Sequence, residues 1–149
     1  MITNFIIGFF IPWLYGIYLY IKSPKIIVLI APFASVVAFT INDWGFNYDF
    51  WEFTPIQNEQ SYSALSYNLG VFPLLFCAFV YFIHFKKKNI LISLIGFVLL
   101  TTLIELGFVM VGKVIYGNSW TIWWTFLSYL IAYVIAYGYY KLLRRHQLI

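Results

Sequence analysis

Five long apolar runs dominate this chain and decide what it can fold into. They cover residues of about 2–21, 26–42, 65–85, 90–111 and 120–140. A helix needs about 20 apolar residues to cross the roughly 30 Å hydrocarbon core of a bilayer, and four of the five runs reach that length. With 63% hydrophobic and only 9% charged residues among 149, the chain is also too apolar for an ordinary soluble domain. We predict a single all-α transmembrane domain of five helices over residues 1–149, with no separate soluble catalytic domain.

The basic residues predict how these helices are oriented. With five spans, the clusters at 22–25, 86–88 and 141–145 fall on one side of the membrane, and together they hold eight of the nine Lys and Arg. Only Lys113 falls on the other side. The positive-inside rule makes the basic side cytoplasmic, so we expect the N-terminus outside and the C-terminus inside. These short clusters are typical of topology signals, and we do not expect nucleic-acid binding.

The connection between the second and third runs, residues 43–64, is the longest segment outside the predicted helices. It interleaves aromatic rings with four of the five acids, Asp43, Asp49, Glu52 and Glu59. We interpret it as an aromatic and acidic segment that lies at the outer interface or folds over the outer mouth of the bundle. Its carboxylates do not follow the spacing of an EF-hand loop, and we expect no metal site there.

Glu105 is the one ionisable acid or base well inside a run. At 1.5 Å per residue from Ile90, it lies about 22 Å along a core of roughly 30 Å, in the outer third. A carboxyl at that depth is costly, so we expect it to face the bundle interior, close to Asn42 and Asn68 at similar depth. Two interpretations stay open: Glu105 is a ligand or proton site, or it is an interhelical hydrogen-bonding residue that fixes packing.

Catalytic motifs are missing from the sequence. There is no HExxH, GxSxG, Walker A or CxxC pattern, and the lone Cys77 can form neither an intrachain disulfide nor a thiolate metal site. We therefore expect no cofactor and favour a protein that is not an enzyme. Small-residue stripes, Ala34 with Ala38 and Ser128 with Ala132 and Ala136, would let helices approach closely. Our leading hypothesis is action in the bilayer through a membrane-protein partner or a homo-oligomer.

Several short elements together resemble a known group of proteins. They are Pro24 with Lys25, the segment 42–53 with Gly45 and Trp51, the segment 63–73, and Glu105 followed by Gly112, Tyr116 and Trp120. This pattern resembles an uncharacterised family of small multi-spanning membrane proteins found mainly in Gram-positive, often spore-forming, bacteria. The resemblance implies the fold, a multi-pass location in the bacterial plasma membrane, and the importance of Glu105, Tyr116 and Trp120. It implies no activity.

Two further functions remain open on the sequence. The first is proton- or cation-linked transport centred on Glu105. The second is binding, with or without catalysis, of a lipid-like molecule between spans three, four and five, with Glu105, Tyr116 and Trp120 at its outer mouth. A cavity that reaches Glu105 would favour the second function, and a tightly packed interior would disfavour it.

Overall fold

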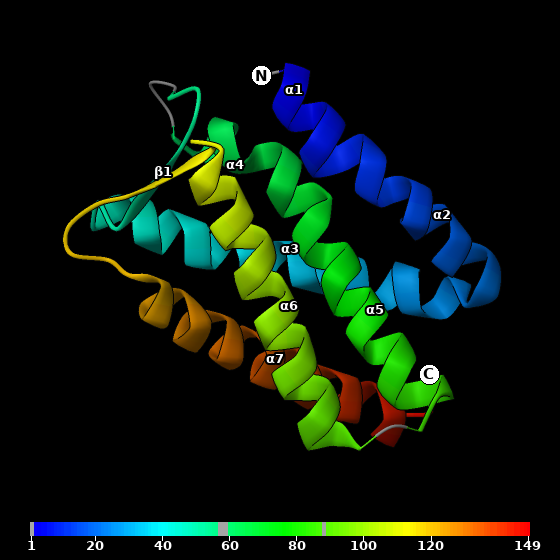
Figure 1. Ribbon diagram of the computed structural model, residues 1–149. Coiled ribbons are helices and arrows are strands. Elements are labelled where there is room, and N and C mark those ends of the chain that lie inside the picture. Colours follow the sequence, from blue (N-terminus) through cyan, green and yellow to red (C-terminus); the bar gives the residue numbers. More distant parts are fainter. Residues whose placement is uncertain (1, 57–59, 88) are drawn as a thin grey trace.

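The computed structural model describes residues 2–56, 60–87 and 89–149. Within these residues, five helices are long and apolar enough to cross a membrane, which confirms the predicted number of apolar helices. They extend over Ile2–Lys22, Pro24–Asn47, Gln60–Phe85, Ile90–Met110 and Ile122–Arg145. By the length and composition of these helices, the chain is a multi-pass helical membrane protein (Figure 1).

Two of the five helices are subdivided. The first consists of α1 (Ile2–Phe5), a π-helical turn η1 (Ile6–Phe10) and α2 (Ile11–Lys22). The third consists of α4 (Gln60–Leu69) and α5 (Val71–Phe85), which meet at Gly70. The other three are continuous helices: α3 (Pro24–Asn47), α6 (Ile90–Met110) and α7 (Ile122–Arg145).

Local sequence signals explain several helix ends. Pro24 occupies the first turn of α3, where its missing N–H costs no hydrogen bond, and Ser23 separates this helix from α2. Asn89 precedes α6, and its side-chain oxygen accepts hydrogen bonds from the backbone N–H groups of Leu91 and Ile92. Arg144 and Arg145 lie in the last turn of α7, where positive charge is favourable.

The segment between the second and third helices is shorter than predicted. Helix α3 continues to Asn47 and α4 begins at Gln60, so both ends of the expected 43–64 connection are helical. Buried Gly45 and Phe46 in the last turns of α3 pack with Trp51, and these tertiary contacts hold the helix beyond the end of its apolar run. Glu59 lies outside the described residues.

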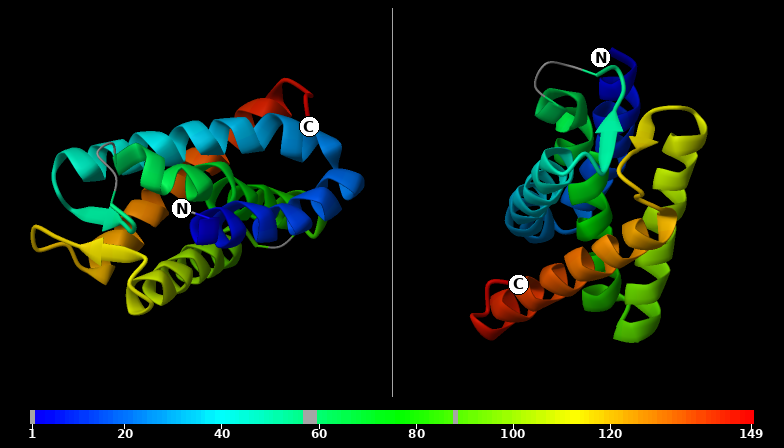
Figure 2. Two further views of the ribbon diagram at one scale, coloured as in Figure 1. Left: turned by 90° about the horizontal axis from the view of Figure 1, so that it is seen from above. Right: turned by 90° about the vertical axis from the view of Figure 1, so that its left-hand side faces the viewer.

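A short strand pair joins the two loops at one end of the bundle. Strand β1 (Trp51–Phe53) and strand β2 (Val114–Tyr116) are antiparallel, with Trp51 opposite Tyr116 (Figure 2). Gly117 N–H donates to the Phe50 carbonyl at 2.9 Å, and Thr54 N–H donates to the Lys113 carbonyl at 3.0 Å. These hydrogen bonds connect the segment after α3 to the segment after α6. We call the end of the bundle that carries the two strands the strand end.

The other end of the bundle carries most of the basic residues, and we call it the basic end. The turn between α2 and α3, the end of α5 and the end of α7 all lie there (Figure 1). The described basic side chains at this end are Lys22, Lys25, Lys86, Lys87, Lys141, Arg144 and Arg145.

The small-residue stripes are used inside the chain. Helix α3 packs along α5, and α6 packs along α7. Ala34, Ala132 and Ala136 are all buried in the main hydrophobic core, where Phe76, Phe79 and Tyr133 stack. These three alanines therefore let helices of this chain approach one another closely.

Candidate functional site

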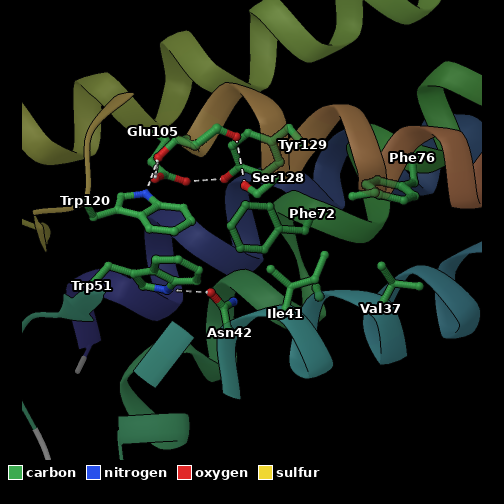
Figure 3. A pocket seen from close by; sticks show the side chains of 13 residues that line it. Val37, Ile41, Asn42, Trp51, Phe72, Phe76, Glu105, Trp120, Ser128 and Tyr129 are labelled. Carbon is green, nitrogen blue, oxygen red and sulfur yellow. Dashed lines mark hydrogen bonds between the residues drawn. The ribbon is translucent and has the colours of Figure 1, made fainter. Parts of the chain in front are cut away.

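A cavity opens between α3 and α7 near the strand end, with α5 behind it (Figure 3). Its volume is about 40 Å³. Most of the lining is apolar and extends from the strand end towards the middle of the bundle: Val37, Ala38, Ile41, Phe72, Phe76 and Ala132. Its polar lining lies at the strand end, where Asn42, Glu105 and Thr125 meet the rings of Trp51 and Trp120. The cavity is thus polar at one end and apolar along the rest.

Glu105 is the centre of the polar end. The Tyr116 hydroxyl donates to Oε1 of Glu105 at 2.8 Å, and Thr125 Oγ1 lies 3.2 Å from the same oxygen. The Tyr129 hydroxyl donates to Oε2. An ionised carboxylate is an acceptor-only group with about four lone-pair positions, so all three hydroxyls can point at it. The arrangement holds a carboxylate in a half-buried position without a basic partner on the cavity wall.

Two separate elements, α7 and β2, bring these hydroxyls to α6, which carries Glu105. Thr125 and Tyr129 lie four residues apart on α7 and therefore share one face of that helix. Tyr116 ends β2, and the pairing of β2 with β1 fixes it opposite Trp51. Burial and the neighbouring Glu105 carboxyl raise the pKa of Tyr116 above its ordinary value, so its hydroxyl stays protonated and able to donate near neutral pH.

Two tryptophans close the strand end of the cavity. The rings of Trp51 and Trp120 lie 4.8 Å apart, centroid to centroid, and Phe50 lies 4.8 Å from Trp120. The Trp51 Nε1–H donates to Asn42 Oδ1 at 3.0 Å, and the Trp120 Nε1–H donates to Thr125 Oγ1 at 2.8 Å. Because both indole N–H groups have protein acceptors, the rings offer a ligand mainly their aromatic surface.

The five residues singled out in the sequence fall in one region. Tyr116 contacts Glu105 directly, Trp120 reaches it through Thr125, and Asn42 lines the same cavity. Asn68 is buried behind Asn42 and accepts a hydrogen bond from its amide at 2.5 Å. The cavity lies between the second, third and fifth helices, whereas the lipid-like hypothesis named spans three, four and five; the fourth helix contributes Glu105 from the side.

Sequence reasoning missed Thr125 and Tyr129. Thr101 and Thr102 lie one turn from Glu105 on α6, but their hydroxyls donate to the Phe97 and Val98 carbonyls of their own helix. Thr125 and Tyr129 share one face of α7, but the same helix also carries Ser128 and four further tyrosines, so the sequence did not mark this pair.

The outer acids do not join this site. Asp43 and Asp49 are exposed, and half-buried Glu52 accepts a hydrogen bond from Gln60 at 3.3 Å. Across the described ranges, no three His, Cys, Asp or Glu side chains are grouped so that they could hold a metal ion. Asp43, Asp49 and Glu52 therefore do not line the cavity that Glu105 borders.

Comparison with known proteins adds no relative. No protein-family model, curated protein or solved structure matches this chain.

Proposed function

We propose that this chain is a multi-pass membrane protein that binds the polar end of an amphiphilic molecule from the bilayer at Glu105. One observation carries the proposal: a carboxyl group surrounded by three hydroxyls lies at the polar end of a cavity whose remaining wall is apolar. Ligand sites are typically concave and apolar with a few placed polar groups. A molecule with one polar end and one hydrocarbon chain matches this division.

The interhelical hydrogen-bonding interpretation explains part of the same geometry. Glu105 on α6 and Tyr129 on α7 do connect two helices. A purely structural carboxyl needs only its hydrogen-bond partners, however, and a closed apolar wall around them would serve it best. Here the same carboxyl borders a cavity between α3 and α7, two helices that meet over only a short length. The cavity favours a binding role for Glu105.

In this proposal the chain lies in a bacterial plasma membrane, with the strand end outside and the basic end in the cytoplasm. The basic clusters at one end of the bundle support this orientation through the positive-inside rule. The resemblance to small membrane proteins of Gram-positive bacteria supports the bacterial location. Glu105 then opens towards the outer leaflet.

Two other hypotheses stay predictions. Action through a protein partner or a homo-oligomer was proposed from the small-residue stripes, the aromatic and acidic outer segment, and the missing catalytic motifs; three alanines of the stripes pack inside this chain. Proton- or cation-linked transport would also use Glu105. It differs from our proposal because it requires net movement of a proton or cation across the membrane.

Native mass spectrometry of the full chain tests the proposal. The protein is released from bacterial membranes in two different detergents, as wild type and as the variants Glu105→Gln, Ala132→Phe and Glu52→Gln. Ala132 is buried on the apolar wall, and Glu52 is a carboxyl that does not line the cavity. We expect a one-to-one adduct of lipid size, of equal mass in both detergents, that is depleted in the first two variants and retained in Glu52→Gln.

Two results would count against binding at this site. One is the absence of any adduct, above all if a stoichiometric protein partner or a defined oligomer is released instead, because that outcome favours the partner hypothesis. The other is an adduct retained equally by all three variants, since it would be bound elsewhere on the protein.

A further inference from the structure

We propose that the polar end of the bound molecule is a primary ammonium group, so that the ligand class is single-chain lipophilic amines. This inference rests on the proposed function and specifies its ligand. Four properties of the cavity carry it: its charge, its hydrogen-bonding capacity, its size and its aromatic wall.

The charge of the cavity is one-sided. Glu105 is the one carboxyl among the described lining residues, and these include no Lys, Arg or His. In a low-dielectric region, burial disfavours the charged form of a carboxyl group, a neighbouring cation favours that form, and a neighbouring anion disfavours it further. An ammonium beside Glu105 would complete an ion pair that the protein itself leaves open.

The hydrogen-bonding capacity points the same way. Most polar hydrogens around the cavity already have protein acceptors. The indole N–H groups of Trp51 and Trp120 donate to Asn42 and Thr125, respectively, and the Tyr129 hydroxyl donates to Glu105. Ser128 donates to the Thr125 carbonyl at 2.8 Å. One hydrogen of the Asn42 amide is left once the other is donated to Asn68.

Acceptor capacity, in contrast, is in surplus. Tyr116 and Thr125 approach one oxygen of Glu105 and Tyr129 the other, so Oε2 keeps an unused lone-pair position. The Ser128 hydroxyl oxygen also remains able to accept. A head group that donates hydrogen bonds therefore finds partners, whereas a head group that only accepts them finds almost none.

The cavity has room for a small head group. The space open to the centre of a water-sized sphere is about 40 Å³, and one water molecule needs roughly 10–15 Å³ of such space. A primary ammonium therefore fits, and it donates hydrogen bonds that a trimethylammonium group cannot donate. The hydrocarbon chain would leave the cavity along the apolar side chains of α3 and α7 towards the lipid.

The aromatic wall suits a cation. Trp51, Trp120, Phe72 and Tyr129 all line the cavity. Aromatic faces attract cations, tryptophan most strongly, and the attraction increases when water is excluded. Since both indole N–H groups have protein acceptors, the rings add attraction for a cation without adding donors for an anion.

Four probes with the same chain length separate these properties. We would titrate purified full chain in a non-ionic detergent at pH 8 with n-dodecylamine, dodecyltrimethylammonium, dodecanol and dodecanoate, and measure affinity by calorimetry. We expect n-dodecylamine to bind about tenfold more tightly than dodecanol, as when a charge-assisted hydrogen bond replaces a neutral one. Dodecyltrimethylammonium should bind more weakly than the amine, and dodecanoate weakest of all.

Matched variants locate the preference. In Glu105→Gln we expect the affinities for the amine and the alcohol to converge, because the amide keeps an acceptor and loses the charge. Glu52→Gln removes a carboxyl away from the cavity and should leave the preference intact. If Glu105→Gln does not fold, the ranking of the four probes on the wild-type protein still decides the question.

Each contrary result has a distinct meaning. Equal binding of the alcohol and the amine, or tighter binding of dodecanoate, overturns the ammonium inference and leaves the proposed function standing. Equal binding of the trimethylammonium probe overturns the assignment to a primary ammonium. Binding of none of the four probes overturns both the inference and the proposed function.

Discussion

Tyr129 and Tyr133 lie one turn apart on α7 but hold their hydroxyls in different surroundings. The Tyr133 hydroxyl lies 2.8 Å from Thr101 Oγ1, and Thr101 also donates to the Phe97 carbonyl, so it keeps a partner if Tyr133 is changed. The Tyr129 hydroxyl donates to Glu105. Its loss leaves Oε2 of half-buried Glu105 without that donor, and an oxygen that loses its donor inside a protein costs about 1–3 kcal/mol.

The pair gives a first prediction. We expect Tyr133→Phe to lower the free energy of unfolding by about 0.6 kcal/mol, as for an average hydrogen bond between membrane helices, and Tyr129→Phe to lower it by about 1–3 kcal/mol. Equilibrium unfolding in mixed micelles measures both values, and each variant is the control for the other, since each removes one hydroxyl from a tyrosine ring that packs inside the bundle. A smaller loss for Tyr129→Phe would mean that Glu105 does not depend on this donor.

Gly45 gives a second prediction at the scale of a single residue. A Cβ atom at this position would lie 2.1 Å from Cζ2 of Trp51, so alanine must displace the indole that closes the cavity. We expect Gly45→Ala to destabilise the protein by about 1–3 kcal/mol, as overpacking does. Gly138→Ala is the control, because nothing lies within 4 Å of its Cβ position. Equal thermal midpoints for the two variants would contradict the packing of Trp51 against α3.

At the scale of elements, the strand pair is what holds Tyr116 at Glu105. Gly117 and Lys113, which flank β2, each form a backbone hydrogen bond with a residue that flanks β1, and Ile115 lies midway between them. Because hydrogen-bonded positions alternate along an antiparallel pair, the Ile115 N–H points to β1, where Glu52 lies opposite. Ile115→Pro would remove that donor and should lower the free energy of unfolding by about 0.5–1.5 kcal/mol. Ile115→Thr is a suitable control, because the side chain is exposed and threonine favours strands. If both variants melt together, the strand pair does not contribute to stability.

The sequence predicted the helices better than the contacts between them. Five apolar runs indicate five helices because hydropathy is a local property of composition. The pairing of residues 51–53 with residues 114–116 could not be predicted, since each strand has only three residues, which is too short for an alternating pattern to identify a strand. Thr125 and Tyr129 were missed because an apolar span does not show from sequence alone which face meets α6. Glu105 was found because it is the one ionisable acid or base well inside an apolar run, and Tyr116 and Trp120 were named because the family resemblance implied their importance.

At the scale of the whole molecule, the two ends of the bundle are chemically different. The basic end carries seven of the described Lys and Arg residues, whereas the strand end carries Asp43, Asp49 and Glu52 together with the cavity and its tryptophans. A ligand that enters from the lipid would therefore meet Glu105 in the leaflet that faces the strand end. Which leaflet this is depends on the orientation of the chain, and orientation can be measured directly.

Cysteine labelling in whole cells makes that measurement. In a Cys77→Ala background, which removes the one native thiol, exposed Ser119 at the strand end and exposed His146 at the basic end are each replaced by cysteine. Because the basic clusters predict a cytoplasmic basic end, we expect a membrane-impermeant maleimide to label Ser119→Cys in intact cells and His146→Cys only after permeabilisation. The opposite pattern would place Glu105 in the inner leaflet and make the ligand a molecule supplied from the cytoplasm. Labelling of both positions in intact cells would show that the helices do not form one bundle with a single orientation.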